Sequence, residues 1–152
     1  MEKTPTQVRR ANRDDLAAMA ACDPLAATRR GWLEESLDQA RCLVAEGPEG
    51  IRGFLVVELR FFGHAFISLL AVHPQARRQG HALALLEAAE AHCHTPKLFT
   101  STNVSNSAAR ALFRRAGFEP SGSITNLDEG DDELVYYKPC GSPPPPALMT
   151  AP

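Results

Sequence analysis

The sequence lacks a net excess of charge of either sign, because 18 Asp and Glu residues balance its 16 Lys and Arg residues. The formal net charge of −2 provides no overall positive field, so we expect no nucleic-acid partner. No run approaches the roughly 20 apolar residues that a membrane-spanning helix requires. Residues 1–13 are too polar for a secretory signal. These absences predict a cytoplasmic protein that does not act at a membrane.

Cysteine is also scarce, and no Cys-x-x-Cys pair occurs. The four positions are Cys22, Cys42, Cys93 and Cys140. This scattered spacing argues against a disulfide framework or a zinc site, and it suits a reducing cytosol. His92, Cys93 and His94 are consecutive, but neighbouring helix positions point to different sides and cannot close one metal site. We therefore expect no bound metal.

Apolar periodicity and turn residues predict an alternation of strands and helices along most of the chain. Strands are expected at 7–10, 41–46, 51–59, 65–72, 98–102, 118–124 and 134–138. Helices are expected at 13–21, at 29–40, between Gly80 and Pro96, and at 107–116. The strand–helix–strand unit at 65–102 requires a parallel, right-handed crossover. The expected fold class is therefore α/β (α+β), with a mixed, mostly antiparallel sheet of about six to seven strands and helices on both faces.

The C-terminal end departs in composition from the rest of the chain. We place one domain, large enough for a hydrophobic core, at residues 1–139. Residues 140–152 form a proline-rich tail with four consecutive prolines, which cannot pack as helix or strand. We expect this tail to trail in solvent as polyproline II or disorder, with a proline-motif ligand for a partner as the alternative.

The most informative segment is an apolar strand, Ala65–Val72, followed by a short basic turn and a helix rich in alanine and leucine. A turn that enters a helix presents free backbone N–H groups and the positive end of the helix dipole. Arg77 and Arg78 add positive charge there, and Gly80 lets the backbone approach a ligand closely because it has no Cβ. An anion, above all a pyrophosphate, is the expected ligand.

Two blocks of this chain resemble the signature of the GCN5-related N-acetyltransferases. The turn Arg77-x-x-Gly80-x-Ala82 is similar to the family motif (Gln/Arg)-x-x-Gly-x-(Gly/Ala). Residues Asn106–Phe118 resemble the family segment Asn-x-x-Ala-x-x-Leu-(Tyr/Phe)-x-x-x-Gly-Phe, and the two blocks have the family's spacing. The resemblance extends to about Pro139 and implies the acyl-CoA N-acyltransferase fold.

The resemblance also implies a cosubstrate, acetyl-CoA, with coenzyme A as the product. The pyrophosphate-binding turn would consist of Arg77, Arg78, Gln79, Gly80, His81 and Ala82. The end of the preceding strand would pair its backbone with the pantetheine arm at Leu70, Ala71 and Val72. In the second block, Asn106 would bond the arm or nearby groups, and Ala109 and Phe113 would line its path.

Two positions depart from the family pattern. Many members carry a tyrosine where this chain has Phe113, and that tyrosine protonates the leaving thiolate, which phenylalanine cannot do. The ribosomal-protein alanine acetyltransferases carry a glutamate base where Ser101 aligns, and a serine cannot act as a base at neutral pH. The chain is therefore not expected to be that kind of enzyme, and its acid and base must come from elsewhere.

Several other side chains could move the protons. Glu58 is the only carboxylate within an otherwise apolar strand, which makes it the candidate base, although a solvated strand-end glutamate has the same sequence. Tyr136 and Tyr137 alternate across the last strand, so one could replace the missing acid while the other is core; Tyr136 is our candidate. His64 is expected to be solvated in a turn, and the acidic run 128–133 could attract an amine or could be a solvated loop.

The function that these residues predict is acetyl transfer from acetyl-CoA to a primary amine. A small-molecule acceptor is favoured over a protein N-terminus or lysine. The spacing of motifs does not identify the acceptor, because acceptor specificity lies in variable loops. The alternative is a catalytically silent module that binds acyl-CoA or a partner protein. A monomer or a homodimer is expected.

Overall fold

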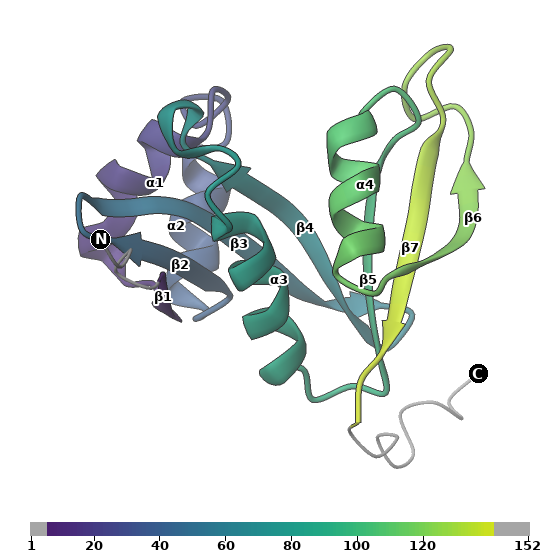
Figure 1. Ribbon diagram of the computed structural model, residues 1–152, viewed down its shortest axis with the longest axis horizontal. Helices are drawn as coiled ribbons and strands as arrows, with labels where there is room; N and C mark the ends of the chain where they lie inside the picture. Colours follow the sequence, from purple (N-terminus) through teal and green to yellow (C-terminus); the bar gives the residue numbers. More distant parts are fainter. Residues whose placement is uncertain (1–5, 142–152) are drawn as a thin grey trace. The chain divides into compact units, whose positions relative to one another are not determined.

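The computed structural model describes residues 6–141, and the elements follow the predicted order (Figure 1). The strands are β1 (Gln7–Arg10), β2 (Cys42–Gly47), β3 (Gly50–Phe61), β4 (His64–Val72), β5 (Lys97–Asn103), β6 (Glu119–Ile124) and β7 (Glu133–Pro139). The α-helices are α1 (Leu16–Cys22), α2 (Arg30–Asp38), α3 (His81–Ala91) and α4 (Ser107–Arg115). Two short 3-10 helices, η1 (Arg13–Asp15) and η2 (Pro74–Ala76), complete the list. The helix expected at 13–21 is therefore two pieces, η1 and α1.

The strand order is β1-β2-β3-β4-β5-β7-β6, which confirms a mixed, mostly antiparallel sheet. The pair β4–β5 is parallel, whereas β1–β2, β2–β3, β5–β7 and β6–β7 are antiparallel. The β3–β4 hairpin turns at Phe62 and Gly63, which both have positive φ values, 52° and 80°. No helix among residues 6–141 is long and apolar enough to cross a membrane.

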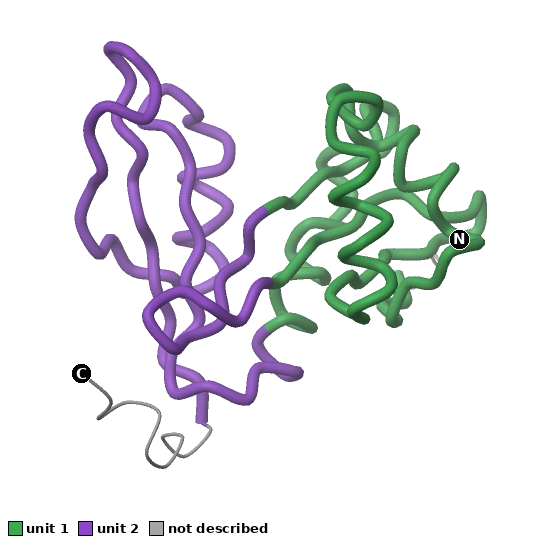
Figure 2. The backbone as a smooth tube through the Cα atoms, turned by 180° about the vertical axis from the view of Figure 1, so that it is seen from behind, with its two compact units in different colours: residues 1–57, 69–89 green, residues 58–68, 90–152 purple. Residues whose placement is uncertain are grey.

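The chain divides into two compact units, which Figure 2 shows in different colours. Unit 1 comprises residues 1–57 and 69–89, and unit 2 comprises residues 58–68 and 90–152. Strands β3 and β4 each supply residues to both units. The predicted pyrophosphate turn belongs to unit 1, and the second family block belongs to unit 2.

The core of unit 1 forms between the sheet and the helices α1 and α2. Met19 and Leu33 come from these helices, and Val44 and Phe54 come from β2 and β3; all four are fully buried. Gly53 faces the opposite side of β3, where an added Cβ would lie 3.3 Å from Leu85 of α3. Because successive strand residues point to opposite faces, α1 and α2 cover one face of unit 1 and α3 covers the other. Helices on both faces were predicted, and unit 1 confirms them.

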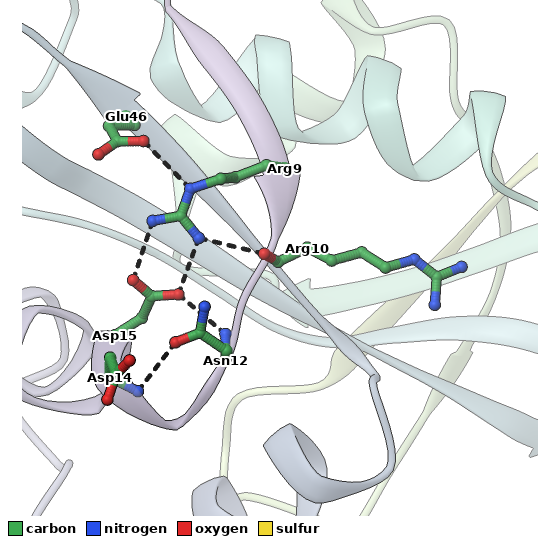
Figure 3. Close-up of polar contacts among 6 residues, drawn as sticks. All are labelled: Arg9, Arg10, Asn12, Asp14, Asp15 and Glu46. Atoms are coloured by element: carbon green, nitrogen blue, oxygen red, sulfur yellow. Dashed lines mark hydrogen bonds and ion pairs between the residues drawn. The ribbon is translucent and has the colours of Figure 1, made fainter.

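A polar cluster fastens β1 to β2 and to η1 (Figure 3). The Arg9 guanidinium donates two hydrogen bonds of 2.9 Å to the Asp15 carboxylate and a third, of 3.1 Å, to Glu46. Asp15 also accepts from the Asn12 backbone N–H, and the Asn12 side chain accepts from the Asp14 backbone N–H, which forms a capping box. The Arg9 cation lowers the pKa of the buried Asp15 carboxyl.

Unit 2 has aromatic side chains on both faces of its strands. On the face that α4 covers, Phe113 packs against Tyr136, with 5.4 Å between the ring centroids. On the opposite face the register places Phe66, Phe99 and Tyr137 in one row across β4, β5 and β7. These three rings are half-buried, and the Phe99 and Tyr137 centroids lie 6.1 Å apart. The position of α4 therefore decides which tyrosine enters the core.

The folded part of the chain extends beyond Pro139. Cys140 was placed in the tail, but it is buried, and its backbone N–H donates to the Pro96 carbonyl at 2.8 Å. The β5–β7 ladder pairs Lys97 with Pro139, so the same pairing direction carries Cys140 to Pro96. The tail therefore begins no earlier than Gly141, and residues 142–152 lie outside the described part of the chain.

Candidate active site in two parts

The basic turn between β4 and α3 has the backbone geometry of an anion-binding loop. After η2, Arg78 adopts φ = 63° and Gly80 adopts φ = 88°, so two left-handed residues fold the chain into the start of α3. The Ala84 N–H donates to the Gly80 carbonyl, which makes Gly80 the first residue to accept a helical hydrogen bond. Glycine has no side chain to cap the helix, so the first N–H groups of α3 remain available to a ligand.

The surroundings of this turn fit a pyrophosphate. Arg77 and Arg78 are exposed, and no atom lies within 4 Å of the position that a Cβ on Gly80 would occupy. The helix dipole and the two guanidinium groups favour an anion at the same place. The residues present therefore match the phosphate-binding chemistry that the sequence predicts.

The His81 side chain does not take part in the predicted anion site. Its ring is buried, its Nδ1 atom lies 3.0 Å from the Thr6 hydroxyl, and its Cε1 atom lies 3.7 Å from the position of a Cβ on Gly47. Burial, together with the positive charge of Arg52, lowers the pKa of His81. His81 can thus contribute only its backbone N–H to the turn, and its neutral ring anchors the start of α3.

The strand before the turn offers an unpaired backbone edge. The parallel β4–β5 ladder pairs Ala65–Ile67 with Leu98–Thr100 and, within residues 6–141, ends there. Leu70, Ala71 and Val72 lie beyond the end of that ladder. Their edge can accept an extended ligand as an added strand, since strand-like backbone pairing supplies main-chain hydrogen bonds.

The second family block builds the start of α4. The Asn106 Oδ1 atom accepts the Ala109 N–H at 3.1 Å, so Asn106 caps the helix and keeps its exposed Nδ2 amide for other partners. Ala109 is half-buried on the first turn. Phe113 is buried between Phe118 and Tyr136, so its ring is part of the core of unit 2.

The two tyrosines of β7 lie on opposite faces, as alternation predicted, but Tyr136, the candidate acid, is the one that is buried in the core. Tyr136 is 1% exposed and packs against Phe113. Tyr137 is half-buried on the opposite face, and a hydrogen bond to Glu119, together with the negative charge of that residue, raises its pKa. Tyr136 is therefore the phenol next to the position that the family tyrosine would occupy.

The other candidates have more ordinary surroundings. Glu58 is half-buried near the end of β3, directly after the buried segment that includes Val56. His64 is not solvated, contrary to expectation, because it begins β4 and its ring packs on Phe99 at 5.6 Å. Burial, with a contribution from the Lys97 cation, lowers the pKa of His64. The His73 Nδ1 atom accepts the Gln75 N–H, so this imidazole caps η2.

The acidic run has a structural role that its composition did not reveal. Asn103 donates to the Asp128 carboxylate at 2.7 Å, and the Ser105 hydroxyl donates to Asp131. These bonds hold the loop between β6 and β7 against the loop that precedes α4. Asp128 and Asp131 therefore act as acceptors that join two loops of unit 2.

A cleft between α1 and α2 was not predicted. It has a volume of about 600 Å³, and its lining includes Asp14, Ala20, Asp23 and Leu33. Asp23 is buried, accepts the Leu25 N–H at 2.9 Å and forms an ion pair with Arg29 at 3.0 Å. The cleft involves two helices and their connection, and no local pattern in the sequence encodes such a space.

The fold is that of an acyltransferase, and comparison with known proteins agrees. The model of the Acetyltransferase (GNAT) family matches residues 8–118, so the chain belongs to the GNAT family. Acetyltransferases of this family use acetyl-CoA as the acetyl donor. No curated protein sequence matches the chain.

Solved structures of the same fold are numerous. A GNAT-family acetyltransferase from Bacillus cereus is 36% identical, with a TM-score of 0.85 over 90% of this chain and 98% of that one. Nourseothricin acetyltransferase is 26% identical, with a TM-score of 0.59 over 65% of this chain and 64% of that one. A Salmonella typhimurium protein solved with its cofactor acetyl-CoA is 17% identical, with a TM-score of 0.71 over 93% of this chain and 97% of that one.

Proposed function

We propose that this GNAT protein is an N-acetyltransferase that moves the acetyl group of acetyl-CoA to a primary amine. The single observation that carries the proposal is the turn between β4 and α3, where Arg78 and Gly80 adopt left-handed backbone conformations at an exposed helix start. A loop of this kind binds a pyrophosphate through backbone N–H groups.

Each part of the cosubstrate has a matching group in the chain. The N–H groups of residues 78–82 and the Arg77 guanidinium would hold the pyrophosphate. The backbone of residues 70–72 would pair with the pantetheine arm, and the Asn106 amide, Ala109 and Phe113 would contact it. Acetyl-CoA supplies an activated thioester when bound, and these residues orient it for attack.

Two side chains of unit 2 are proposed to move the protons. Glu58 would take a proton from the ammonium group of the acceptor, directly or through one water molecule. Tyr136 would donate a proton to the departing thiolate in place of the tyrosine that Phe113 replaces. The contact between the Tyr136 and Phe113 rings, 5.4 Å between centroids, supports this assignment.

The cleft between α1 and α2 supports a small-molecule acceptor. Its volume of about 600 Å³ lies within the range of roughly 300–1,000 Å³ that is usual for small-ligand sites. Its lining carries the carboxylates of Asp14 and Asp23 but also the guanidinium groups of Arg13 and Arg30, so its volume, and not its charge, supports this assignment. Cys22, next to Asp23, hydrogen-bonds the His73 backbone, so the end of α1 adjoins the end of β4 within unit 1.

The decisive experiment follows thiol release from acetyl-CoA with a panel of small amines and with peptides that present a free N-terminus or a lysine. Amine-dependent thiol release, together with an acetylated amine in the mass spectrum, would support the proposal. Coenzyme A binding with no turnover on any amine would instead favour a silent acyl-CoA-binding module, which the Phe113 substitution makes the second candidate.

The acceptor cleft is tested with Ala20→Trp, since Ala20 lines the cleft and tryptophan would fill it. We expect a rise of at least tenfold in KM for the amine, with the KM for acetyl-CoA unchanged. Ala111→Trp, at an exposed position of α4, is the matched control. Equal effects of the two variants on the amine KM would remove the cleft from the proposal.

A further inference from the structure

Two thiols that are 47 positions apart in the sequence meet at the base of unit 2. Cys93 follows α3, and Cys140 follows β7. The Cys140 backbone is held in place because its N–H donates to the Pro96 carbonyl at 2.8 Å. The Cys140 thiol hydrogen-bonds the Cys93 thiol, and each residue is 8% exposed. The sulfurs are thus adjacent and slightly accessible.

The surroundings of Cys93 hold its sulfur beside residues 95–97, the segment to which the Cys140 backbone also bonds. Its Sγ atom lies 3.3 Å from the Thr95 hydroxyl and 3.4 Å from the Thr95 carbonyl. The Thr95 hydroxyl in turn accepts the Ala65 N–H at 3.0 Å, which anchors the loop to β4. On the other side, Lys138 donates to Glu90 at 2.6 Å and to the Ala116 carbonyl at 2.8 Å. The end of α3 and the end of β7 are therefore already joined by polar contacts.

The remaining two cysteines have different surroundings. Cys22 donates its thiol hydrogen to the Ala18 carbonyl one helical turn earlier, and Cys42 is 1% exposed in the core between β2 and the helices. Both belong to the core cluster of unit 1. They provide internal controls of the same residue type and similar burial.

We propose that Cys93 and Cys140 form an oxidisable dithiol site that closes to an intramolecular disulfide when the protein meets a peroxide. The Cys93 sulfur attacks one peroxide oxygen, which gives a sulfenic acid at Cys93 and one molecule of water. The Cys140 sulfur then attacks the sulfenic sulfur, which forms the S–S bond and releases a second water. The two thiols lose two electrons and two protons, and hydrogen peroxide is reduced to two waters.

The assignment of roles follows from the thiol environments. Burial and the neighbouring Cys93 raise the pKa of Cys140 to about 12, so Cys140 remains protonated near neutral pH. A protonated thiol is a poor nucleophile toward peroxide but can donate its hydrogen bond to the Cys93 sulfur. We assign Cys140 as the resolving thiol, and its attack on the sulfenic sulfur should accelerate as pH rises, because more of the Cys140 thiol is then ionised.

Closing the bond would covalently fasten the end of β7 to the connection between α3 and β5. The loop so formed contains β5, α4, β6 and β7. A cross-link over a loop of this length restricts the unfolded chain strongly. We expect the oxidised protein to melt roughly 5 °C or more above the reduced protein.

The experiment treats the folded full-length chain with a small excess of hydrogen peroxide, quenches it, alkylates the remaining thiols and maps the peptides by mass spectrometry without reduction. The expected result is one cross-linked peptide pair that contains Cys93 and Cys140, with Cys22 and Cys42 alkylated. Dithiothreitol should reverse both the cross-link and the rise in Tm.

Variants separate this site from general oxidation. Cys93→Ser and Cys140→Ser should each abolish the cross-link and the rise in Tm, whereas Cys22→Ala and Cys42→Ala should retain both. Cys93→Ala and Cys140→Ala serve as second variants if a serine impairs folding. Sulfinic acids without a cross-link, a bridge between two chains, or unmodified Cys93 and Cys140 under these conditions would each overturn the proposal.

Discussion

At the scale of single residues, the candidate site depends on departures from the family motif and on the direction in which each side chain points. Phe113 removes the hydroxyl that many relatives place at this position, and the only phenol in ring contact with Phe113 among the described residues is Tyr136. His81 belongs to the anion-binding turn by position, yet its ring is buried against Thr6. Residue identity alone therefore does not assign a role; the direction of the side chain is needed as well.

The missing hydroxyl at Phe113 predicts a specific kinetic pattern. Phe113→Tyr should raise kcat, because it restores a phenol where the thiolate departs. Tyr136→Phe should lower kcat in the parent protein but have less effect in the Phe113→Tyr background, which a double-mutant cycle measures. Tyr137→Phe, on the opposite face of β7, is the control and should leave kcat unchanged. Additive effects of the first two variants would contradict a shared role.

Glu58 gives a second prediction at this scale. Glu58→Gln should reduce kcat by about 10²-fold or more, because general-base catalysis typically contributes that much. The acidic limb of the pH–rate profile should disappear, and the affinity for coenzyme A should stay the same. Glu87→Gln, an exposed substitution on α3, is the matched control. An unchanged kcat with an active acceptor would leave Glu58 as a surface residue.

At the scale of elements, short polar clusters fix how strands and helices join. The Arg9 cluster joins β1, β2 and η1 through Asp15 and Glu46, and the loop contacts of Asp128 and Asp131 do the same for unit 2. The turn before α3 is also a junction between two elements, but its proposed role is functional. Its left-handed residues leave helix N–H groups available to a ligand. Each junction depends on contacts between segments that are distant in sequence or on an unusual backbone angle.

The Arg9–Asp15 pair predicts a pH-dependent stability. The pKa of Asp15 is lowered in the folded state, so its contribution is complete above the unfolded value of about 4 and is lost as pH falls through the folded pKa. Asp15→Asn should lower the free energy of unfolding at pH 7 by about 1–3 kcal/mol, less than a fully buried pair because Arg9 is partly exposed.

The difference between Asp15→Asn and the parent should shrink in urea titrations as pH falls from about 4 through the lowered pKa of Asp15, because protonation of the parent carboxyl removes the ion pair. Asp38→Asn breaks the exposed pair with Arg13 and should have little effect at any pH. A constant difference across the pH range would mean that packing, and not the ion pair, accounts for the effect of Asp15.

The turn before α3 predicts the consequence of placing an anion beside the pyrophosphate. Coenzyme A should raise the Tm of the parent in proportion to the logarithm of its concentration, and Gly80→Asp should abolish the rise. Gly80→Ala adds the same Cβ and the same backbone strain at φ = 88° as Gly80→Asp, but without the charge. We therefore expect coenzyme A to raise its Tm less than it raises the Tm of the parent. Gly130→Asp, at φ = 75° in an exposed loop, controls for strain and should respond like the parent.

At the scale of the whole molecule, each compact unit contains some of the residues that are proposed to act. The pyrophosphate turn, the open edge of β4 and the cleft between α1 and α2 belong to unit 1. Asn106, Phe113, Tyr136 and Glu58 belong to unit 2, as does the proposed dithiol. The residues proposed to bind the cosubstrate thus come from both units, whereas the two residues proposed to move protons, Glu58 and Tyr136, come from unit 2 alone.

Truncation tests where the folded part ends. Removing residues 142–152 should leave the Tm and the coenzyme A response unchanged, because a proline-rich segment buries little surface. Removing residues 140–152 should lower the Tm, since it deletes the buried Cys140 and its hydrogen bond to Pro96. A drop of many degrees in the shorter deletion would show that residues beyond Gly141 pack on the domain or on a second copy.

The sequence by itself determined the order of elements and the chemistry of the turn. Apolar runs of period two and apolar stripes of helical period are local properties, and Gly80 beside Arg77 and Arg78 predicts an anion-binding loop within six residues. The boundaries of β1, β5 and α4 were predicted to within one residue for the same reason. The motif spacing added the family, which the match over residues 8–118 confirms.

Only the tertiary structure decided which face of each element is covered. Alternation separates Tyr136 from Tyr137, but the position of α4 places Tyr136 in the core. His64 is buried because Phe99 of another strand packs on it, and Cys93 meets Cys140 because β7 pairs with β5. These contacts join segments tens of residues apart, and periodicity carries no information about such partners, since it describes a segment and not its neighbour in space.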